Sequence, residues 1–217
     1  MTRLVVLISG AGSNMRAIIE ACQSGKLDAN VVAVISNRPD AAGLNFAREQ
    51  NIESTVIDHT TFKTRDHFDA QLAMVIKSYK PDFIVLAGFM RILTAELVNR
   101  FLGRMINIHP SLLPLYPGLN THAKVLQAGD NTHGASVHFV TAELDAGPVI
   151  AQKQVPVLQG DTEQALAARV LQTEHELYVQ ALQLCVSGDA RFADGECYLG
   201  KVSTRANMPD SAHNGQP

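Results

Sequence analysis

The chain has 217 residues, of which 46% are hydrophobic, and it carries a formal net charge of −3 at pH 7. That size and hydrophobic content suffice for one sizeable core, so we expect a single domain over residues 1–202 and a disordered polar tail over 203–217. The sequence has no basic block and no apolar run long enough to span a bilayer, which argues against nucleic acid and membrane as partners.

The N-terminus and the cysteines favour a cytoplasmic location. The opening segment, "MTRLVVLISG", enters an apolar run at once and lacks the longer apolar region and cleavage site of a secretory signal. The three cysteines, Cys22, Cys185 and Cys197, are far apart and form no CxxC pair. This is typical of reduced thiols, so we expect a cytoplasmic protein.

Short apolar segments alternate with helical patterns through the first half of the chain. We expect strands at 4–10, 31–37, 54–58, 82–89 and 104–109. We expect helices at 13–25, 40–50, 65–79 and 94–102. In the first helix Ser13 is a plausible N-cap and Gly25 a stop signal. The alternation predicts an α/β fold with a mostly parallel central sheet and helices on both faces.

The last third of the sequence has a different pattern. Residues 135–157 predict two strands joined through "LDAGP", which we expect to be antiparallel. A long helix should follow over 162–187, and Asp194-Gly195 predicts a two-residue hairpin turn. The segment 111–131 shows no such pattern and is expected to be a loop. The predicted fold is therefore a parallel sheet with an antiparallel C-terminal part.

The stretch "MINIHPSLLP" at 105–114 places two polar side chains in an otherwise apolar strand. Side chains alternate along a strand, so Asn107 and His109 share one face, and Pro110 ends the strand directly after them. Open α/β sheets bind ligands at the carboxyl ends of their strands. An amide and an imidazole at that place suit oxyanion stabilisation and proton transfer. They equally suit a structural role, in which His109 caps the sheet and Asn107 bonds to a loop.

The glycine-rich segment "SGAGSN" at 9–14 follows the first strand and opens the first helix. Backbone N–H groups at such a helix N-terminus favour a bound phosphate. As a dinucleotide fingerprint the segment is poor, because it lacks the third glycine and because Asn37 and Arg38 stand where an acidic residue is expected. A tight turn without a ligand is the alternative.

The remaining candidate groups are a carboxylate and three histidines. Asp145 lies in "LDAGP", where aspartate is a common turn-former. His122, His133 and His138 show no ligand spacing such as HxxxH, so no metal is expected. His138 lies on an expected strand, where it either contacts Asp145 or has a structural role.

Several of these segments together resemble the folate-dependent formyltransferases. "VLISGAGSN", "VLAGFMRIL", "NIHPSLLP", "THGASVHFV" and "LDAGPVI" occur in the order of that family, over nearly the whole chain to about residue 200. The resemblance implies a Rossmann-like formyltransferase fold with 10-formyltetrahydrofolate as co-substrate. It further implies a catalytic trio of Asn107, His109 and Asp145, in which Asn107 and protonated His109 stabilise an oxyanion and Asp145 relays a proton.

The resemblance also implies two sets of binding residues. A phosphoribosylglycinamide substrate would contact Gly12, Ser13, Asn14 and Glu174, the last at its ribose hydroxyls. The folate would contact Arg65, Met90, Arg91, Ile92, Leu93, Asn107, Thr141, Ala142, Glu143, Leu144 and Asp145. On their own, Arg65 and Glu174 would be solvated surface charges, and the apolar residues of the second set would be plain core.

Members of this family differ in the formyl acceptor. A member acting on methionyl-tRNA would need an additional basic C-terminal domain, and a formyltetrahydrofolate hydrolase would typically carry an N-terminal regulatory domain. Here the first strand begins near Leu4. We therefore expect formyl transfer to phosphoribosylglycinamide in de novo purine biosynthesis, by a monomer or weak homodimer. The alternatives are a hydrolase with the same trio and a non-catalytic nucleotide-binding module.

Overall fold

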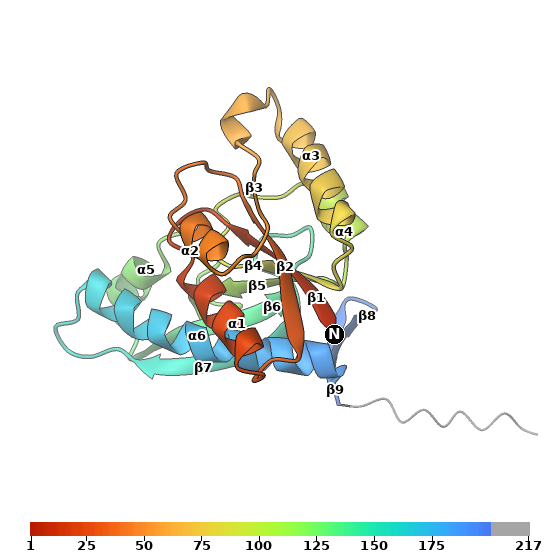
Figure 1. Ribbon diagram of the computed structural model, residues 1–217. Helices are drawn as coiled ribbons and strands as arrows, with labels where there is room; N and C mark the ends of the chain where they lie inside the picture. The colour runs from red at the N-terminus through yellow and green to blue at the C-terminus, as the bar shows by residue number, and fades with distance from the viewer. Residues whose placement is uncertain (201–217) are drawn as a thin grey trace, which may run out of the picture.

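The computed structural model describes residues 1–200, whose centre is a seven-stranded sheet (Figure 1). The strands are β1 (Thr2–Ile8), β2 (Ala29–Ser36), β3 (Ser54–Val56), β4 (Phe83–Leu86), β5 (Met105–His109), β6 (Thr132–Phe139) and β7 (Val149–Pro156). Their order across the sheet is β3-β2-β1-β4-β5-β6-β7. Strands β1 to β5 pair in parallel, whereas β6 is antiparallel to both β5 and β7. The predicted α/β class, with its antiparallel C-terminal part, is confirmed.

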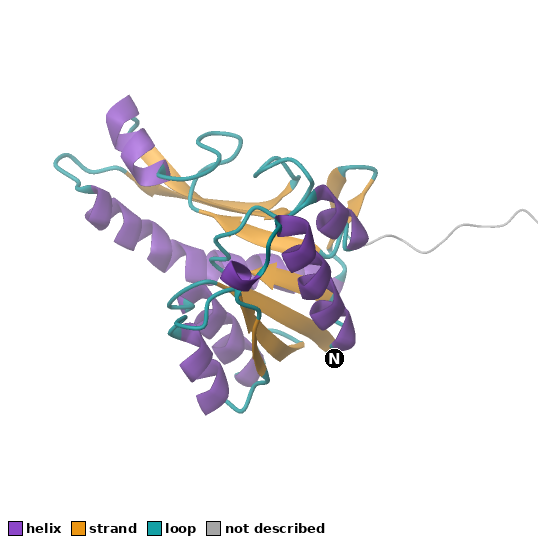
Figure 2. Ribbon diagram, turned by 90° about the horizontal axis from the view of Figure 1, so that it is seen from above, coloured by secondary structure: helices purple, strands orange, loops and turns teal. Residues whose placement is uncertain are grey.

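Helices cover both faces of the sheet (Figure 2). They are α1 (Ser13–Gln23), α2 (Gly43–Glu49), α3 (Arg65–Ser78), α4 (Ala95–Arg100), α5 (Thr121–Ala128) and α6 (Glu163–Ser187), with a 3-10 turn η1 (His59–Thr61). A small hairpin of β8 (Ala190–Ala193) and β9 (Glu196–Leu199) follows α6. Its turn is Asp194-Gly195, with φ values of 51° and 83°, as the sequence predicts.

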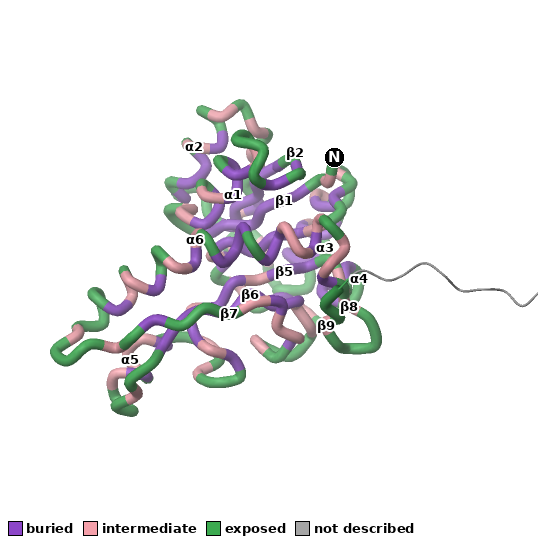
Figure 3. The backbone as a smooth tube through the Cα atoms, turned by 90° about the horizontal axis from the view of Figure 1, so that it is seen from below, coloured by how far each residue is buried: buried purple, intermediate pink, exposed green. Residues whose placement is uncertain are grey.

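The core divides into two layers because side chains alternate along each strand. Leu4, Val6 and Ile8 of β1 pack with α1 and α6 on one face of the sheet. Val5 and Leu7 pack with α3 and α4 on the other face. Figure 3 shows that the central strands are largely buried and that much of β7 is exposed. With both faces of the sheet covered, a ligand site is expected at the carboxyl ends of the strands, as in other open α/β sheets.

Two local expectations are wrong. The segment 111–131 contains the helix α5, which is only eight residues long and turns few apolar side chains inward, so its periodicity is weak. At α1 the N-cap is Gly12 in a left-handed conformation with φ 71°, and Ser13 is the first helical residue. The expected tail over 203–217 lies outside the described residues. Within the described part of the chain, no helix is both long and apolar enough to cross a membrane.

Candidate active site

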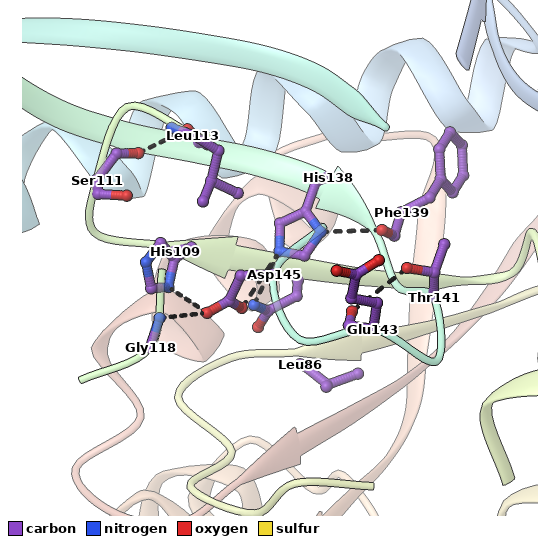
Figure 4. Close-up of polar contacts among 12 residues, drawn as sticks. Leu86, His109, Ser111, Leu113, Gly118, His138, Phe139, Thr141, Glu143 and Asp145 are labelled. Atoms are coloured by element: carbon purple, nitrogen blue, oxygen red, sulfur yellow. Dashed lines mark hydrogen bonds and ion pairs between the residues drawn. The ribbon is translucent and has the colours of Figure 1, made fainter. Parts of the chain in front are cut away.

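Two members of the predicted trio, His109 and Asp145, meet at the carboxyl end of β5 (Figure 4), and the third, Asn107, lies on the same strand. Asn107 and His109 extend from the same face of this strand, and Asp145 reaches them from the loop between β6 and β7. The distance from Nδ1 of His109 to Oδ2 of Asp145 is 3.4 Å. Both side chains are more than nine-tenths buried, with 7% and 9% of their surface exposed. The histidine–carboxylate pair is therefore largely shielded from solvent.

Both ring nitrogens of His109 face hydrogen-bond acceptors. Nε2 lies 3.0 Å from the backbone carbonyl oxygen of Tyr116, which can only accept. Nδ1 faces the carboxylate of Asp145, whose Oδ2 also accepts a 2.8 Å hydrogen bond from the backbone N–H of Gly118. The geometry thus offers an oxygen acceptor to each ring nitrogen of His109.

A second histidine sets the orientation of Asn107. Nδ1 of His138 lies 2.9 Å from the carbonyl oxygen of Phe139 and donates to it, so Nε2 presents a lone pair. Nδ2 of Asn107 lies 3.2 Å from that Nε2 and donates to it. Burial lowers the pKa of His138, which keeps the ring neutral. Because the ring is neutral, its 3.9 Å approach to Asp145 is not an ion pair.

The sequence alone leaves two roles open for His138, a contact with Asp145 or a structural role. In the structure the hydrogen-bond partner of its Nε2 is the amide of Asn107. The antiparallel pairing of β5 with β6 explains this contact, because it places Asn107 directly opposite His138. Residues in such a pair have neighbouring side chains.

The glycine-rich loop opens α1 beside the end of β1. Gly12 has φ 71°, and a Cβ there would lie 3.0 Å from Cε of Met15 and 3.3 Å from Cα of Gly43. The N-cap, a glycine, makes no side-chain hydrogen bond to the first turn of α1. The loop thus combines a close-packed glycine with a helix N-terminus, an arrangement that favours a bound anion.

A buried pair connects this loop to α6. Nδ2 of Asn14 donates a 2.7 Å hydrogen bond to Oε2 of Glu174. Asn14 and Glu174 are only 7% exposed, and burial raises the pKa of Glu174 while the bond from Asn14 lowers it. Oδ1 of Asn14 has no partner among the described residues. The structure thus brings two predicted ribonucleotide-binding residues, 160 positions apart, into direct contact.

A cavity of about 140 Å³ lies between the ends of β4 and β5 and the loop after β6. The predicted folate residues that line it are Arg91, Ile92, Leu93, Asn107, Thr141, Ala142, Glu143, Leu144 and Asp145. Two predicted residues are not in its lining: Arg65 begins α3, and Met90 is 68% exposed. The guanidinium of Arg91 lies 5.0 Å from the ring centroid of Phe68, which orients that loop against α3.

Among residues 1–200 no three His, Cys, Asp or Glu side chains are grouped so as to hold a metal ion. His122 and His133 do meet, with Nδ1 and Nε2 3.0 Å apart. Burial lowers the pKa of His133 to about 4, so this is a neutral hydrogen-bonded pair. It joins α5 to β6.

Comparison with known proteins places this sequence in a family. Residues 2–182 match the family described as formyl transferase. Phosphoribosylglycinamide formyltransferase of Escherichia coli is 48% identical over 90% of this chain and 92% of its own length. The trifunctional purine biosynthetic protein adenosine-3 of Bos taurus is 44% identical over 88% of this chain, which spans 19% of that protein.

A solved structure agrees in fold over the same length. Glycinamide ribonucleotide transformylase 1 from Symbiobacterium toebii superposes with a TM-score of 0.89 and 40% identity, covering 93% of this chain and 95% of that one. The family match covers most of the described residues, including the ends of β1, β4 and β5 and the loop that carries Asp145. The chain belongs to the formyl transferase family.

Proposed function

We propose that this enzyme transfers the formyl group of 10-formyltetrahydrofolate to the amine of phosphoribosylglycinamide. The products are formylglycinamide ribonucleotide and tetrahydrofolate, and the reaction belongs to de novo purine biosynthesis. The observation that carries the proposal lies at the end of β5, where His109 and Asp145 form a buried pair and Asn107 and Asp145 line a cavity. The near full-length similarity to phosphoribosylglycinamide formyltransferase of Escherichia coli supports the choice of acceptor.

The reaction needs a neutral amine and a stabilised oxyanion. The amine attacks the formyl carbon, and the carbonyl oxygen takes up the negative charge of the tetrahedral intermediate. Asn107 and protonated His109 donate hydrogen bonds to that oxygen. In enzymes, loss of one such donor typically costs about 3–4 kcal/mol of barrier. In the structure Nε2 of His109 faces the Tyr116 carbonyl oxygen, and the formyl oxygen replaces that acceptor during turnover.

Asp145 has two roles in this mechanism. Its carboxylate faces Nδ1 of His109 and stabilises the imidazolium through charge. It also accepts the proton that the attacking nitrogen loses as the new C–N bond forms, and that proton goes to the folate nitrogen as the old C–N bond breaks. The hydrogen bond from Gly118 keeps one carboxylate oxygen in place during both steps.

The two substrates approach from opposite sides of the trio. The phosphate of the ribonucleotide binds the backbone N–H groups of Gly12, Ser13 and Asn14 at the start of α1. Glu174, held by Asn14, accepts hydrogen bonds from the ribose hydroxyls. The pterin of the folate occupies the cavity lined by residues 91–93 and 141–145, which places its formyl group next to Asn107. Arg65 and Met90 complete the folate contacts only at its periphery.

A hydrolase with the same trio is the alternative, and the relatives from Escherichia coli and Symbiobacterium toebii do not favour it because both are named for formyl transfer. The test is to measure tetrahydrofolate formation from 10-formyltetrahydrofolate with and without phosphoribosylglycinamide. A transferase forms product only with the amine present. Equal rates in both reactions would replace the transferase by a hydrolase.

A further inference from the structure

The proposed function assigns the glycine-rich loop to one substrate and residues 90–93 to the other, and these two loops are connected by hydrogen bonds. The pairing of β1 with β4 continues past the end of β4 through a 2.9 Å bond from Ala87 N to the Leu7 carbonyl, and past the ends of both strands through a 3.0 Å bond from Ser9 N to the Gly88 carbonyl. Beyond these bonds the backbones diverge, one into the glycine-rich loop and the other into residues 90–93. The last connection is made by a side chain: Met90 N donates a 2.7 Å hydrogen bond to Oγ of Ser9.

The Ser9 hydroxyl is buried and its direction is fixed. Ser9 is 6% exposed and Asn37, at the end of β2, is 2% exposed. The hydroxyl hydrogen is donated to Oδ1 of Asn37, which leaves an oxygen lone pair for Met90 N. Nδ2 of Asn37 in turn lies 3.2 Å from Nδ1 of His59 in η1. A buried hydroxyl with both of its functions engaged holds the two loops at one relative position.

We infer that Ser9 couples the two substrate sites as a positioning residue. This inference rests on the proposed function. The backbone of Ser9 leads directly into residues 10–14 at the ribonucleotide site, and its hydroxyl holds the loop at the folate site. Because this hydrogen bond fixes the position of one loop relative to the other, a ligand that orders one loop orders both, and the second ligand loses less conformational entropy on binding. Each ligand therefore raises the affinity for the other by the same factor.

The test uses a ternary complex that cannot react, made of tetrahydrofolate and phosphoribosylglycinamide. Calorimetry gives the dissociation constant of tetrahydrofolate with and without saturating ribonucleotide. In the unsubstituted enzyme we expect the ribonucleotide to tighten tetrahydrofolate binding by about fivefold or more. In Ser9→Ala the enhancement disappears, although each ligand still binds alone.

A matched control separates coupling from a general loss of packing. Ser36 is also fully buried at a strand end, but its hydroxyl bonds only within its own turn, to the backbone of Arg38. Ser36→Ala should keep the enhancement. Asn37→Ala releases the Ser9 hydroxyl without removing it and should give an intermediate enhancement, which keeps the inference testable if Ser9→Ala folds poorly.

The outcomes separate this inference from the proposed function. The coupling role of Ser9 is overturned if the ribonucleotide enhances tetrahydrofolate binding equally in the unsubstituted enzyme, Ser9→Ala and Asn37→Ala. It is also overturned if the unsubstituted enzyme shows no enhancement. In either case normal transfer by the unsubstituted enzyme leaves the proposed function intact. Failure of the unsubstituted enzyme to bind either ligand overturns both.

Discussion

Nδ2 of Asn107 lies 3.2 Å from Nε2 of His138, and the two residues stand directly opposite each other on β5 and β6. Because burial lowers the pKa of His138, the ring is a neutral acceptor. The amide of Asn107 therefore has one orientation, with its second N–H available to a ligand. The pair therefore connects the buried His138 to Asn107, the proposed oxyanion donor.

The pair predicts that His138→Phe lowers turnover by freeing the Asn107 amide to rotate. The loss should not exceed the roughly 10²- to 10³-fold that removal of one oxyanion donor costs. A double-mutant cycle with Asn107→Ala is the measurement, because His138→Phe should add little once the amide is gone. Fully additive losses in kcat would mean that His138 does not act through Asn107.

Asp145→Asn tests the carboxylate at nearly constant volume. An asparagine oxygen can still accept from Gly118, but the negative charge facing His109 is lost. We expect kcat to fall by about 10²- to 10⁴-fold, the range typical for loss of a general acid–base group, while the melting temperature stays close to that of the parent. Turnover near the parent rate would exclude Asp145 from proton transfer.

The glycine-rich loop predicts a selective effect on one substrate. Gly12→Ala places a Cβ 3.0 Å from Cε of Met15 in a left-handed conformation, at the proposed phosphate site. Gly25→Ala is the matched control, because Gly25 has φ 75° but has no atoms within 4 Å of the added Cβ. Both variants should lose roughly 1–2 kcal/mol of stability. Only Gly12→Ala should weaken ribonucleotide binding in calorimetry, with folate binding preserved, and similar affinities in both variants would argue against the site.

Burial of Glu174 predicts that replacing its carboxylate raises the stability of the fold but weakens ribonucleotide binding. Burial raises its pKa in the folded state, so its contribution to stability is present at acid pH and is lost as pH rises through the folded-state pKa. Glutamine carries no charge, so Glu174→Gln avoids the cost of burying an ionised carboxylate and should raise the free energy of unfolding at neutral pH. The same substitution should weaken ribonucleotide binding, because an amide accepts less strongly than a carboxylate.

Glu176 on the same helix supplies the control with the opposite sign. It is exposed, and its hydrogen bond with Lys153 lowers its pKa, so its contribution is present at neutral pH and lost as pH falls. Urea denaturation between about pH 4 and pH 7 should therefore separate Glu174→Gln from Glu176→Gln. If Glu174→Gln is less stable than the parent at neutral pH, the Asn14–Glu174 bond outweighs the cost of burial.

The elements that could be predicted from sequence are those with strong periodicity. Strand and helix alternation predicted the parallel part, and the Asp194-Gly195 turn predicted the last hairpin. Helix α5 was missed because its eight residues bury little apolar surface. Periodicity reports burial, so a short and mostly exposed helix leaves no clear pattern in the sequence.

The candidate site divides in the same way. Asn107 and His109 were predictable because they are two residues apart on one strand and therefore share a face. The contact of Asn14 with Glu174, by contrast, joins residues 160 positions apart, and no local pattern indicates it. Likewise, the Tyr116 carbonyl at His109 depends on the path of a loop backbone, which side-chain patterns do not encode.

The most direct measurement of the central claim follows the formyl carbon itself. The enzyme is incubated with phosphoribosylglycinamide and 10-formyltetrahydrofolate carrying an isotope label in the formyl group, and the products are separated by mass. Transfer at Asn107, His109 and Asp145 predicts that labelled formylglycinamide ribonucleotide forms in equal amount to tetrahydrofolate. In His109→Ala, transfer of the label should be far slower than in the parent. Label recovered as free formate, with unlabelled ribonucleotide, would contradict the account.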